Sequence, residues 1–223
     1  MVLTEQGTAS RRFNRTEAKS VRELQLIKAT IECIAKHGLT GTTLAKVTEV
    51  AGSSLGFVNF HFKSKERLLE ATLKLLAVEH HSQWQKDVEE PGLSDIDRLL
   101  RIADSHFYPR ICSRKKLAVW FAFFGEANNR GAYRKIVDDI DDERFAEIFR
   151  LCQSIKAEGN YSEIDPKQVA MTLEGLFDGL WLNMLLYPDL YTTEISKKQV
   201  HIFLAAMFPR HFGRSMPCNE RTA

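Results

Sequence analysis

One stretch of the sequence, TLAKVTEVAGSSLGFVNFHFKSK at residues 43–65, constrains the fold more than any other. Its apolar residues recur every three or four positions, which is the spacing of one face of an α-helix. Because the spacing continues across the small break AGSS, two short helices, over 44–51 and 54–61, are predicted to share one buried seam. The seam residues are Leu44, Val47, Ala51, Leu55, Val58 and Phe62.

Hydroxyl residues stand where these two helices would begin. Thr42 or Thr43 is expected to cap the first helix, and Ser53 or Ser54 the second. Such side chains accept hydrogen bonds from the free N–H groups of a helix's first turn. The two helices are therefore separated by a very short turn.

Longer helical patterns flank this pair. One covers residues 21–37 and closes at Gly38, and another begins at a cap provided by Ser64. The apolar residues are Leu24, Ile27, Ile31 and Ile34 in the first pattern, and Leu68, Leu69, Leu73 and Leu76 in the second. The first of these helices can pack against the seam of the short pair.

The remainder of the chain also shows a helical period throughout. Candidate helices cover about 94–108, 114–129, 132–158, 166–187 and 195–208. Sustained alternation with a period of two is absent from the sequence, so no sheet is expected. We predict an all-α fold with a small three-helix head and a larger helical body.

Composition excludes several classes of protein. Hydrophobic residues make up 44% and charged residues 27% of 223 residues, as in ordinary globular proteins. The longest apolar stretches are too short or too interrupted by charge to span a bilayer, and the N-terminus has no apolar signal core. The four cysteines are widely spaced, which favours a reducing cytoplasm over a disulfide framework or a zinc site.

Charge is distributed unevenly. Residues 1–76 carry 12 Lys and Arg against 7 Asp and Glu, whereas residues 77–223 carry 19 against 22. A basic N-terminal third indicates contact with a polyanion, and a solvated basic tail is the alternative. The basic residues nearest the N-terminus are Arg11, Arg12, Arg15, Lys19 and Arg22.

Two helices joined by a turn of three or four residues form a helix-turn-helix unit, whose second helix enters the major groove of DNA. The residues expected to form the DNA face are Thr43, Ser54, Gly56, Phe57, Asn59, Phe60, His61 and Lys65. Asn59 can hydrogen-bond a base edge, and Phe57 or Phe60 can touch a thymine methyl group. Lys65 is expected to hold a phosphate, and Arg11, Arg12 and Arg15 can reach the backbone or a minor groove.

The pattern TTLAKVTEVAGSSLGFVNFHFKSKERLLEAT resembles the DNA-binding domain of the TetR family of transcriptional regulators. The motif residues include Thr43, Ala51-Gly52, Gly56, His61-Phe62 and Lys65. Two positions depart from the family pattern as we interpret it. Asn59 replaces a frequent Tyr in the recognition helix, and His61 replaces a Tyr that commonly contacts phosphate. Neutral His61 can still donate one hydrogen bond to a phosphate.

The segments AVWFAFFGEA and LEGLFDGLWLNMLL resemble the body of the BetI-type subgroup, the choline-responsive repressors. This resemblance implies a homodimer whose late helices pair as a four-helix bundle, bound to a palindromic operator and controlled by a small molecule. Pairing with a second copy is expected over 166–187 and 195–208, and packing within one chain is the alternative.

An aromatic wall with a carboxylate suits a quaternary ammonium ion, through cation–π attraction and charge. The expected ligand-binding residues are Trp120, Phe123, Phe124, Glu174, Phe177, Asp178 and Trp181. The same aromatic residues can be plain core, and an apolar or aromatic effector is the alternative ligand.

An enzyme is disfavoured, because the sequence lacks a phosphate loop, a nucleophile elbow and a spaced set of metal ligands. We expect no catalytic residue, no metal and no cofactor apart from the effector. A helical adaptor that does not bind DNA is disfavoured by the basic head. The expected organisation is a basic flexible arm (1–20), the helix-turn-helix domain (21–66), an effector-binding and dimerisation domain (67–212) and a disordered tail (213–223).

Overall fold

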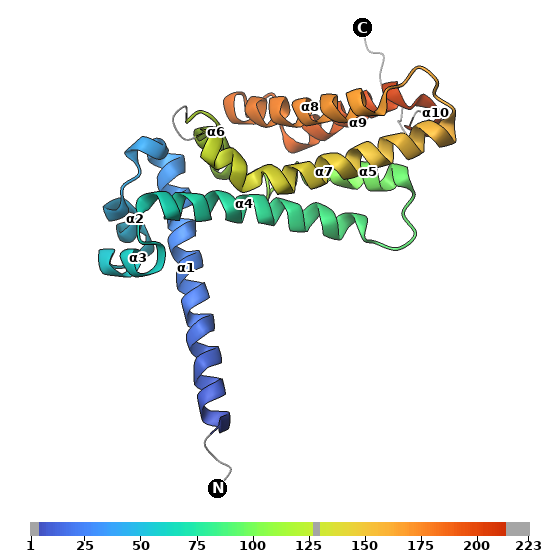
Figure 1. Cartoon of the computed structure of the whole chain (residues 1–223). Helices are drawn as coiled ribbons and strands as arrows, with labels where there is room; N and C mark the ends of the chain where they lie inside the picture. The colour runs from blue at the N-terminus through green and yellow to red at the C-terminus, as the bar shows by residue number, and fades with distance from the viewer. Residues whose placement is uncertain (1–4, 127–129, 213–223) are drawn as a thin grey trace. The chain divides into compact units, whose positions relative to one another are not determined.

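The computed structural model describes the backbone of residues 5–126 and 130–212, and the side chains of 20–126 and 131–211. Within these ranges the chain is helical and forms no strand, which confirms the all-α prediction. The helices in Figure 1 are α1 (Glu5–Gly41), α2 (Leu44–Ala51), α3 (Leu55–Phe62), α4 (Lys65–Val88), α5 (Asp95–Ser105), α6 (Arg114–Phe124), α7 (Arg130–Gly159), α8 (Pro166–Leu186), α9 (Thr193–Met207) and α10 (Pro209–Phe212).

The chain divides into two compact units. The first contains the residues up to Leu75 together with Ala118–Tyr133, and the second contains Leu76–Leu117 and the residues from Arg134 onward. The expected domain boundary after residue 66 differs from this division. Helix α4 continues through that point without a break, so its first three turns remain with the head.

Local signals define the helices of the head. Gly38 has a φ of 68°, in the left-handed region that favours glycine, and it ends the straight part of α1 at the predicted position. The hydroxyl groups of Thr43 and Ser54 accept hydrogen bonds, each of 3.3 Å, from the backbone N–H groups of Lys46 and Phe57. These two residues are therefore the caps among the alternatives that the sequence left open.

The core of the head lies between α1, α2, α3 and the start of α4. Its buried members are Leu26, Ala29, Cys33, Val47, Ala51, Val58 and Leu68, with Ile27, Leu44, Phe57 and Phe62 packed against them. The predicted seam is wrong at Leu55, which is 49% exposed. Gly52 has a φ of 58°, so the chain turns between the two helices and the helical period of α2 does not carry into α3.

The N-terminal range differs from the expected flexible arm. Helix α1 already begins at Glu5, and residues 5–20 are helical in their backbone (Figure 1). The range contains Glu, Gln, Ala, Arg and Lys residues with good helix propensity and no proline, which accounts for the helix. The tail expected at 213–223 lies outside the described residues.

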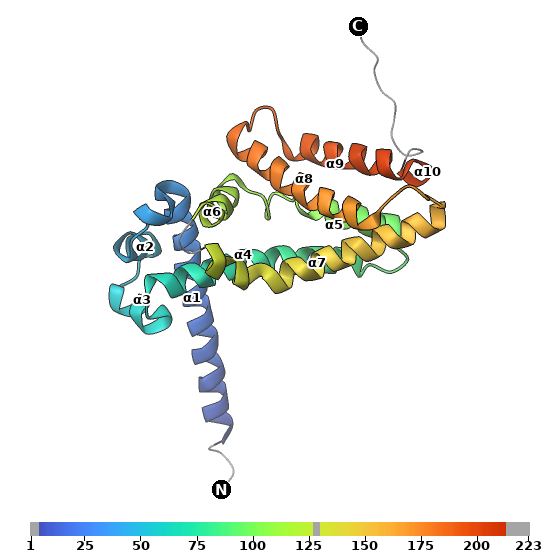
Figure 2. The ribbon, with the colours of Figure 1, turned by 45° about the horizontal axis from the view of Figure 1, so that its top comes forward.

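The second unit is built around α7, α8 and α9, with α5 and the later part of α4. Helix α8 begins with Pro166 behind an Asp165 cap, and α9 begins behind Thr192, whose hydroxyl accepts a hydrogen bond from Ile195. Helices α8 and α9 are neighbours along the chain and lie side by side in Figures 1 and 2. The buried face of α8 carries Val169, Ala170, Leu173, Phe177, Leu180, Trp181 and Met184.

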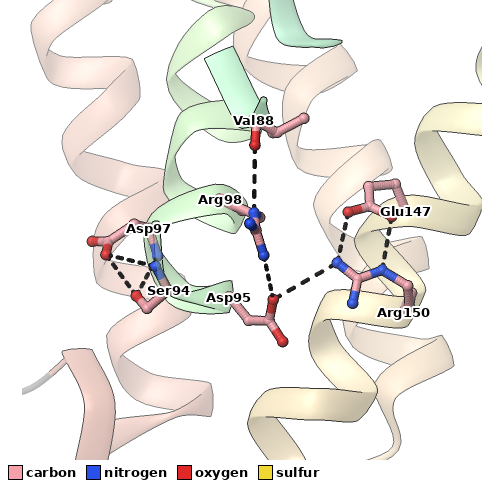
Figure 3. Close-up of polar contacts among 7 residues, drawn as sticks. All are labelled: Val88, Ser94, Asp95, Asp97, Arg98, Glu147 and Arg150. Atoms are coloured by element: carbon pink, nitrogen blue, oxygen red, sulfur yellow. Dashed lines mark hydrogen bonds and ion pairs between the residues drawn. The ribbon is translucent and has the colours of Figure 1, made fainter. Parts of the chain in front are cut away.

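A polar network holds one end of this unit together (Figure 3). Ser94 and Asp97 form a reciprocal capping box at the start of α5. The guanidinium of Arg150 on α7 lies 3.7 Å from the Asp95 carboxylate on α5 and 2.8 Å from Glu147. This network links the start of α5 to α7.

Helix α8 is the one helix of the described chain long and apolar enough to cross a membrane by length and composition. Charged residues interrupt this stretch, which is why the sequence predicts no membrane span there. The core helix of a globular protein meets the same criteria, and α8 buries seven residues against its own unit.

Three of the cysteines are buried free thiols. They are Cys33, Cys112 and Cys152, and none of them forms a disulfide. Burial raises the pKa of the Cys112 thiol to about 11 and that of Cys152 to about 12. These thiols are therefore protonated at neutral pH and serve as small apolar core residues.

Candidate nucleic-acid interface and effector site

Helix α3 has one exposed face. Leu55, Gly56, Asn59 and Phe60 are exposed, at steps of one, three and one residues, which place them on a single side of the helix, and the C-cap residue Lys63 is also exposed. The opposite side carries Val58, which is fully buried in the head core. The short helix is therefore anchored by one face and free to enter a groove with the other.

The exposed face has the chemistry of a base-reading surface. Phe60 is 75% exposed, which is unusual for a large apolar side chain unless it meets a partner. The amide of Asn59 has no hydrogen-bond partner among the described residues, so its donor and acceptor groups are available to a base edge. Ser54 and Gly56, also predicted for this face, are exposed beside them.

Phe57 differs from its predicted place on the DNA face. Its ring is half-buried and packs against the head core, and the guanidinium of Arg22 on α1 lies 5.5 Å above it. The position follows from the helical period, because Phe57 lies next to Val58 and one turn before His61, on the side that faces α1. Phe57 thus joins α3 to α1.

His61 is not placed to act as predicted. Only 3% of its side chain is exposed, and its Nδ1 lies 3.0 Å from Oε1 of Glu23 on α1. Since a carboxylate only accepts hydrogen bonds, Nδ1 carries the proton, and in the neutral ring Nε2 is then an acceptor. A neutral His61 in this arrangement has no N–H left to donate to a phosphate.

Lys65 and Thr43 both have partners within the head; the cap role of Thr43 was predicted from the sequence, whereas the bond of Lys65 was not. Lys65 Nζ donates a hydrogen bond of 3.1 Å to the carbonyl oxygen of Leu39, near the end of α1. An ammonium group has two further donors, so phosphate contact remains compatible with this bond. Thr43 is exposed at the start of α2, where its hydroxyl already caps the helix. The side chains of Arg11, Arg12, Arg15 and Lys19 lie outside the described residues.

The residues predicted to bind a ligand fall into two groups, one in each unit. In the first unit Phe123 is fully buried and meets the Tyr133 ring edge-on, with centroids 4.8 Å apart. Trp120 is buried and stacks on Phe124, which is partly exposed. The ring contacts of Trp120 and Phe123 are thus packing contacts within the first unit.

The second group belongs to an aromatic cluster in the second unit. The ring of Phe177 stacks on that of His106, with centroids 3.8 Å apart and planes 16° from parallel. Trp181 donates its indole N–H to the backbone oxygen of His106 at 2.9 Å. His80 on α4 completes the cluster, edge-on to His106 at 4.3 Å.

Glu174 is held by an arginine that the sequence-based analysis did not select. The guanidinium of Arg144 on α7 donates to both carboxylate oxygens of Glu174, at 3.1 and 2.6 Å, and to Asp141 at 2.9 Å. Arg144 is only 8% exposed. The predicted free carboxylate of a cation cage is therefore already paired.

Asp178 has a different environment. It lies on the exposed face of α8, and no hydrogen bond or ion pair within the described residues engages it. Loss of part of the water around the carboxylate, followed by the negative charge of Glu174 one turn earlier, raises the pKa of Asp178. Burial also raises the pKa of Asp141, against the opposing effect of Arg144. Glu174 and Asp178 were predicted to lie on the same side of α8. Their proximity is seen in the effect of the Glu174 charge on the pKa of Asp178.

The two buried histidines are neutral at pH 7. Burial lowers the pKa of His80 and of His106 well below the usual value, and the positive charge of Arg144 acts in the same direction on both. His106 Nδ1 lies 3.0 Å from the backbone oxygen of Ile102, so this nitrogen carries the proton. Nε2 of His80 is buried and has no hydrogen-bond partner among the described residues.

Two family models match the chain over the regions just described. "Bacterial regulatory proteins, tetR family" matches residues 26–72, and "BetI-type transcriptional repressor, C-terminal" matches residues 95–209. The second match covers more than half of the chain. The chain belongs to the TetR family. It is a DNA-binding transcriptional regulator of the BetI type, and the prediction of a regulator rather than an enzyme is confirmed.

Similarity to individual TetR-family proteins extends over most of the chain. The HTH-type transcriptional regulator BetI of Pseudomonas paraeruginosa (strain DSM 24068 / PA7) is 27% identical over 198 residues, which are 86% of this chain and 96% of the relative. The match includes both the head and the body.

Two solved structures with different ligands share the fold. A transcriptional regulator from Saccharomonospora viridis, in complex with choline, aligns with a TM-score of 0.73 at 18% identity, covering 83% of this chain and 96% of that one. FadR from Bacillus subtilis, in complex with stearoyl-CoA, aligns with a TM-score of 0.69 at 17% identity, covering 82% and 97%. At these identities the likeness establishes the TetR-type fold alone.

The functional candidates missed in the sequence are His80, His106 and Arg144. A signal existed for Arg144, because it occupies the apolar stripe of α7. The buried residues Val137, Ile148, Leu151 and Ile155 surround it at helical steps. A charged residue on such a stripe indicates a buried partner elsewhere in the fold. Within the described residues no group of three or more His, Cys, Asp and Glu could hold a metal ion.

Proposed function

We propose that this protein is a homodimeric cytoplasmic repressor that binds a palindromic operator and is released from it by a small organic cation, with choline as the first candidate. It uses no other cofactor. The observation that carries the proposal is the single exposed face of α3, with Asn59 and Phe60 at its centre, in a chain of the TetR family. A dimer presents two such faces, so its operator has two half-sites related by symmetry.

Exposed apolar residues on α8 and α9 support self-association. The exposed face of α8 carries Met171, Leu182 and Leu186, and that of α9 carries Ile195 and Ile202. These apolar side chains recur at helical spacing on two adjacent helices. In a dimer, the same two helices of a second copy would pack against them and complete a four-helix interface.

Two glycines favour close approach of the second copy. Gly175 and Gly179 lie one turn apart on the exposed face of α8, and a Cβ atom at either position would meet nothing within 4 Å in its own chain. The space beside these glycines is therefore open to a partner that packs against α8. A second α8 can approach along this pair more closely than along larger side chains.

The charge around Arg144 supports a cationic effector. The guanidinium of Arg144 pairs with the carboxylates of Glu174 and Asp141, and Asp178 lies one helical turn after Glu174. The neutral His80 and His106 add no positive charge, so the cluster carries more negative than positive charge. A cation near these carboxylates and the ring of Trp181 is stabilised by charge and by cation–π attraction.

An apolar or aromatic effector is the second candidate. Both carboxylate oxygens of Glu174 already accept hydrogen bonds from Arg144. A ligand that contacts only the rings of His106, Phe177 and Trp181 would leave this ion pair intact. The two candidates therefore differ in whether binding depends on the charge of the acidic residues.

Fluorescence anisotropy with a labelled duplex from the region upstream of the gene tests both parts of the proposal. Because choline chloride is a salt, each titration is matched with sodium chloride at equal ionic strength. Salt-sensitive binding that choline weakens beyond the sodium control supports the repressor and its cationic effector. Binding that choline leaves unchanged rejects choline, and absence of binding to this duplex and to random DNA at low salt rejects the operator-binding function.

A further inference from the structure

The face of α3 that meets DNA is supported from behind by one buried ring. His61 lies on the inner side of α3, and its ring meets the exposed Phe60 edge-on, with centroids 5.1 Å apart and planes at 80°. It also contacts Phe57 at 4.2 Å. An edge-to-face contact of this kind restricts the orientation of the outer ring.

The His61 ring is itself fixed by α1. Its Nδ1–H donates to Glu23 Oε1 at 3.0 Å, and the ring is almost wholly buried. The side chain of Glu23 is one-third exposed, so its carboxylate keeps contact with water while it accepts this bond. A charge-assisted hydrogen bond of normal length defines both the tautomer and the plane of the ring.

We propose that Glu23 and His61 are positioning residues for operator recognition, acting in series on Phe60. Glu23 sets the plane of the His61 ring, and the ring sets the orientation of Phe60 on the exposed face of α3. Neither residue touches a base in this arrangement. The inference rests on the proposed operator binding and assigns to His61 a role different from phosphate contact.

The pair is suited to this task because it joins the short helix α3 to α1 directly behind Phe60. The helix has only eight residues, too few to be stable without tertiary contacts. Its contacts to α1 include the Glu23–His61 bond, the Arg22–Phe57 contact and the packing of Val58. Of these, the Glu23–His61 bond leads through direct ring contact to the exposed Phe60.

A double-mutant cycle tests the series arrangement. The probe is a duplex enriched from a random library by the wild-type protein, with an unselected duplex for comparison. We expect Glu23→Ala to lower affinity for the enriched duplex roughly tenfold, which corresponds to one charge-assisted hydrogen bond, with no loss on the unselected duplex. In a Phe60→Ala background the same change should cost less than about twofold.

Two further variants separate charge, hydrogen bond and ring. Glu23→Gln removes the charge but keeps an acceptor for Nδ1–H, so it should retain most of the affinity that Glu23→Ala loses. His61→Asn keeps a donor for Glu23 but removes the ring, so it should lose specificity like Phe60→Ala. Glu49→Ala, on the exposed surface of α2, controls for removal of a negative charge near DNA.

Thermal unfolding of every variant separates loss of fold from loss of positioning. Equal costs of Glu23→Ala with and without Phe60 overturn the series arrangement, as does full specificity in Glu23→Ala or in His61→Asn. If Glu23→Ala does not fold, the comparison of Glu23→Gln with His61→Asn still decides the matter. A wild-type protein that enriches no duplex contradicts the operator-binding function instead.

Discussion

Arg144 and Glu174 form a two-point ion pair that joins α7 to α8 inside the second unit. Nε and one terminal nitrogen of the guanidinium donate to the two carboxylate oxygens, and the other terminal nitrogen donates to Asp141. Two parallel hydrogen bonds fix the geometry of both side chains as well as their separation. The relative rotation of the two helices at this level is therefore specified by polar contacts as well as by packing.

Removing one partner of this pair should be far more damaging than removing both. Arg144→Met leaves the Glu174 carboxylate without its counter-ion, and we expect a loss of about 3–5 kcal/mol in the free energy of unfolding. Arg144→Met/Glu174→Met should lose much less, because the Glu174 carboxylate is removed as well and the remaining partner, Asp141, has a side chain that is 48% exposed. Urea unfolding followed by circular dichroism at pH 7 measures both, and equal losses would contradict the prediction.

Stability should fall when the pH drops below the usual pKa of histidine. His80 and His106 have lowered pKa values in the folded protein, whereas in the unfolded chain they bind protons near 6.5. The unfolded state then binds more protons, so stability is complete above pH 6.5 and is lost as the pH falls below it.

The contribution of one histidine to this slope can be isolated. Each histidine that stays neutral adds about 1.4 kcal/mol per pH unit, and His80→Phe should remove that amount from the slope between pH 6 and 5. Urea midpoints from pH 7.5 to 5 give the measurement. Asp141 and Asp178 have raised pKa values that act in the opposite sense, and because both residues are present in the wild type and in His80→Phe, the comparison of the two slopes isolates His80. An unchanged slope in His80→Phe would show that His80 is charged in the fold.

The glycine pair on α8 should matter for self-association and not for folding. Because a Cβ atom meets nothing in its own chain, Gly175→Ala/Gly179→Ala should leave the monomer folded and raise its helix propensity by roughly 1 kcal/mol per site. The same methyl groups would hold two copies of α8 apart and weaken the proposed dimer. Sedimentation at several concentrations measures this, with Gly131→Ala on α7 as the matched control.

Asn59→Ala should weaken operator binding much more than binding to random DNA. A side-chain amide that reads a base edge contributes about 1–3 kcal/mol of discrimination, which corresponds to roughly five- to 150-fold in affinity. Lys65→Ala should instead weaken both and reduce the dependence of binding on salt concentration. Anisotropy titrations at three salt concentrations distinguish the two patterns, and equal losses on both DNAs for Asn59→Ala would remove it from base reading.

Helical periodicity was sufficient to predict where most helices lie. The predicted ranges 44–51 and 166–187 correspond to α2 and α8 within one residue at each end, because caps, glycine and proline act locally. Periodicity failed for Leu55, since a turn between two helices resets the phase. It also gave no sign that α1 begins as early as Glu5.

The candidate site was only partly readable from the sequence. The exposure of Asn59 and Phe60 follows from their positions in the helical period of α3, so it could be predicted from the sequence. The contacts of His61 with Glu23 and of Arg144 with Glu174 join residues 38 and 30 positions apart. Such pairs depend on how helices meet in space, which the pattern along a single helix does not encode.

The buried thiols have a consequence for how this protein responds to electrophiles and oxidants. Thiolate is the reactive form of cysteine, and Cys33, Cys112 and Cys152 are held as thiols away from solvent. Alkylating reagents should therefore spare these three residues in the native state. With Cys218 changed to Ser, a cysteine introduced at an exposed position such as Ser82 becomes selectively labelled, and pairs of spin labels then report the distance between two copies of the chain.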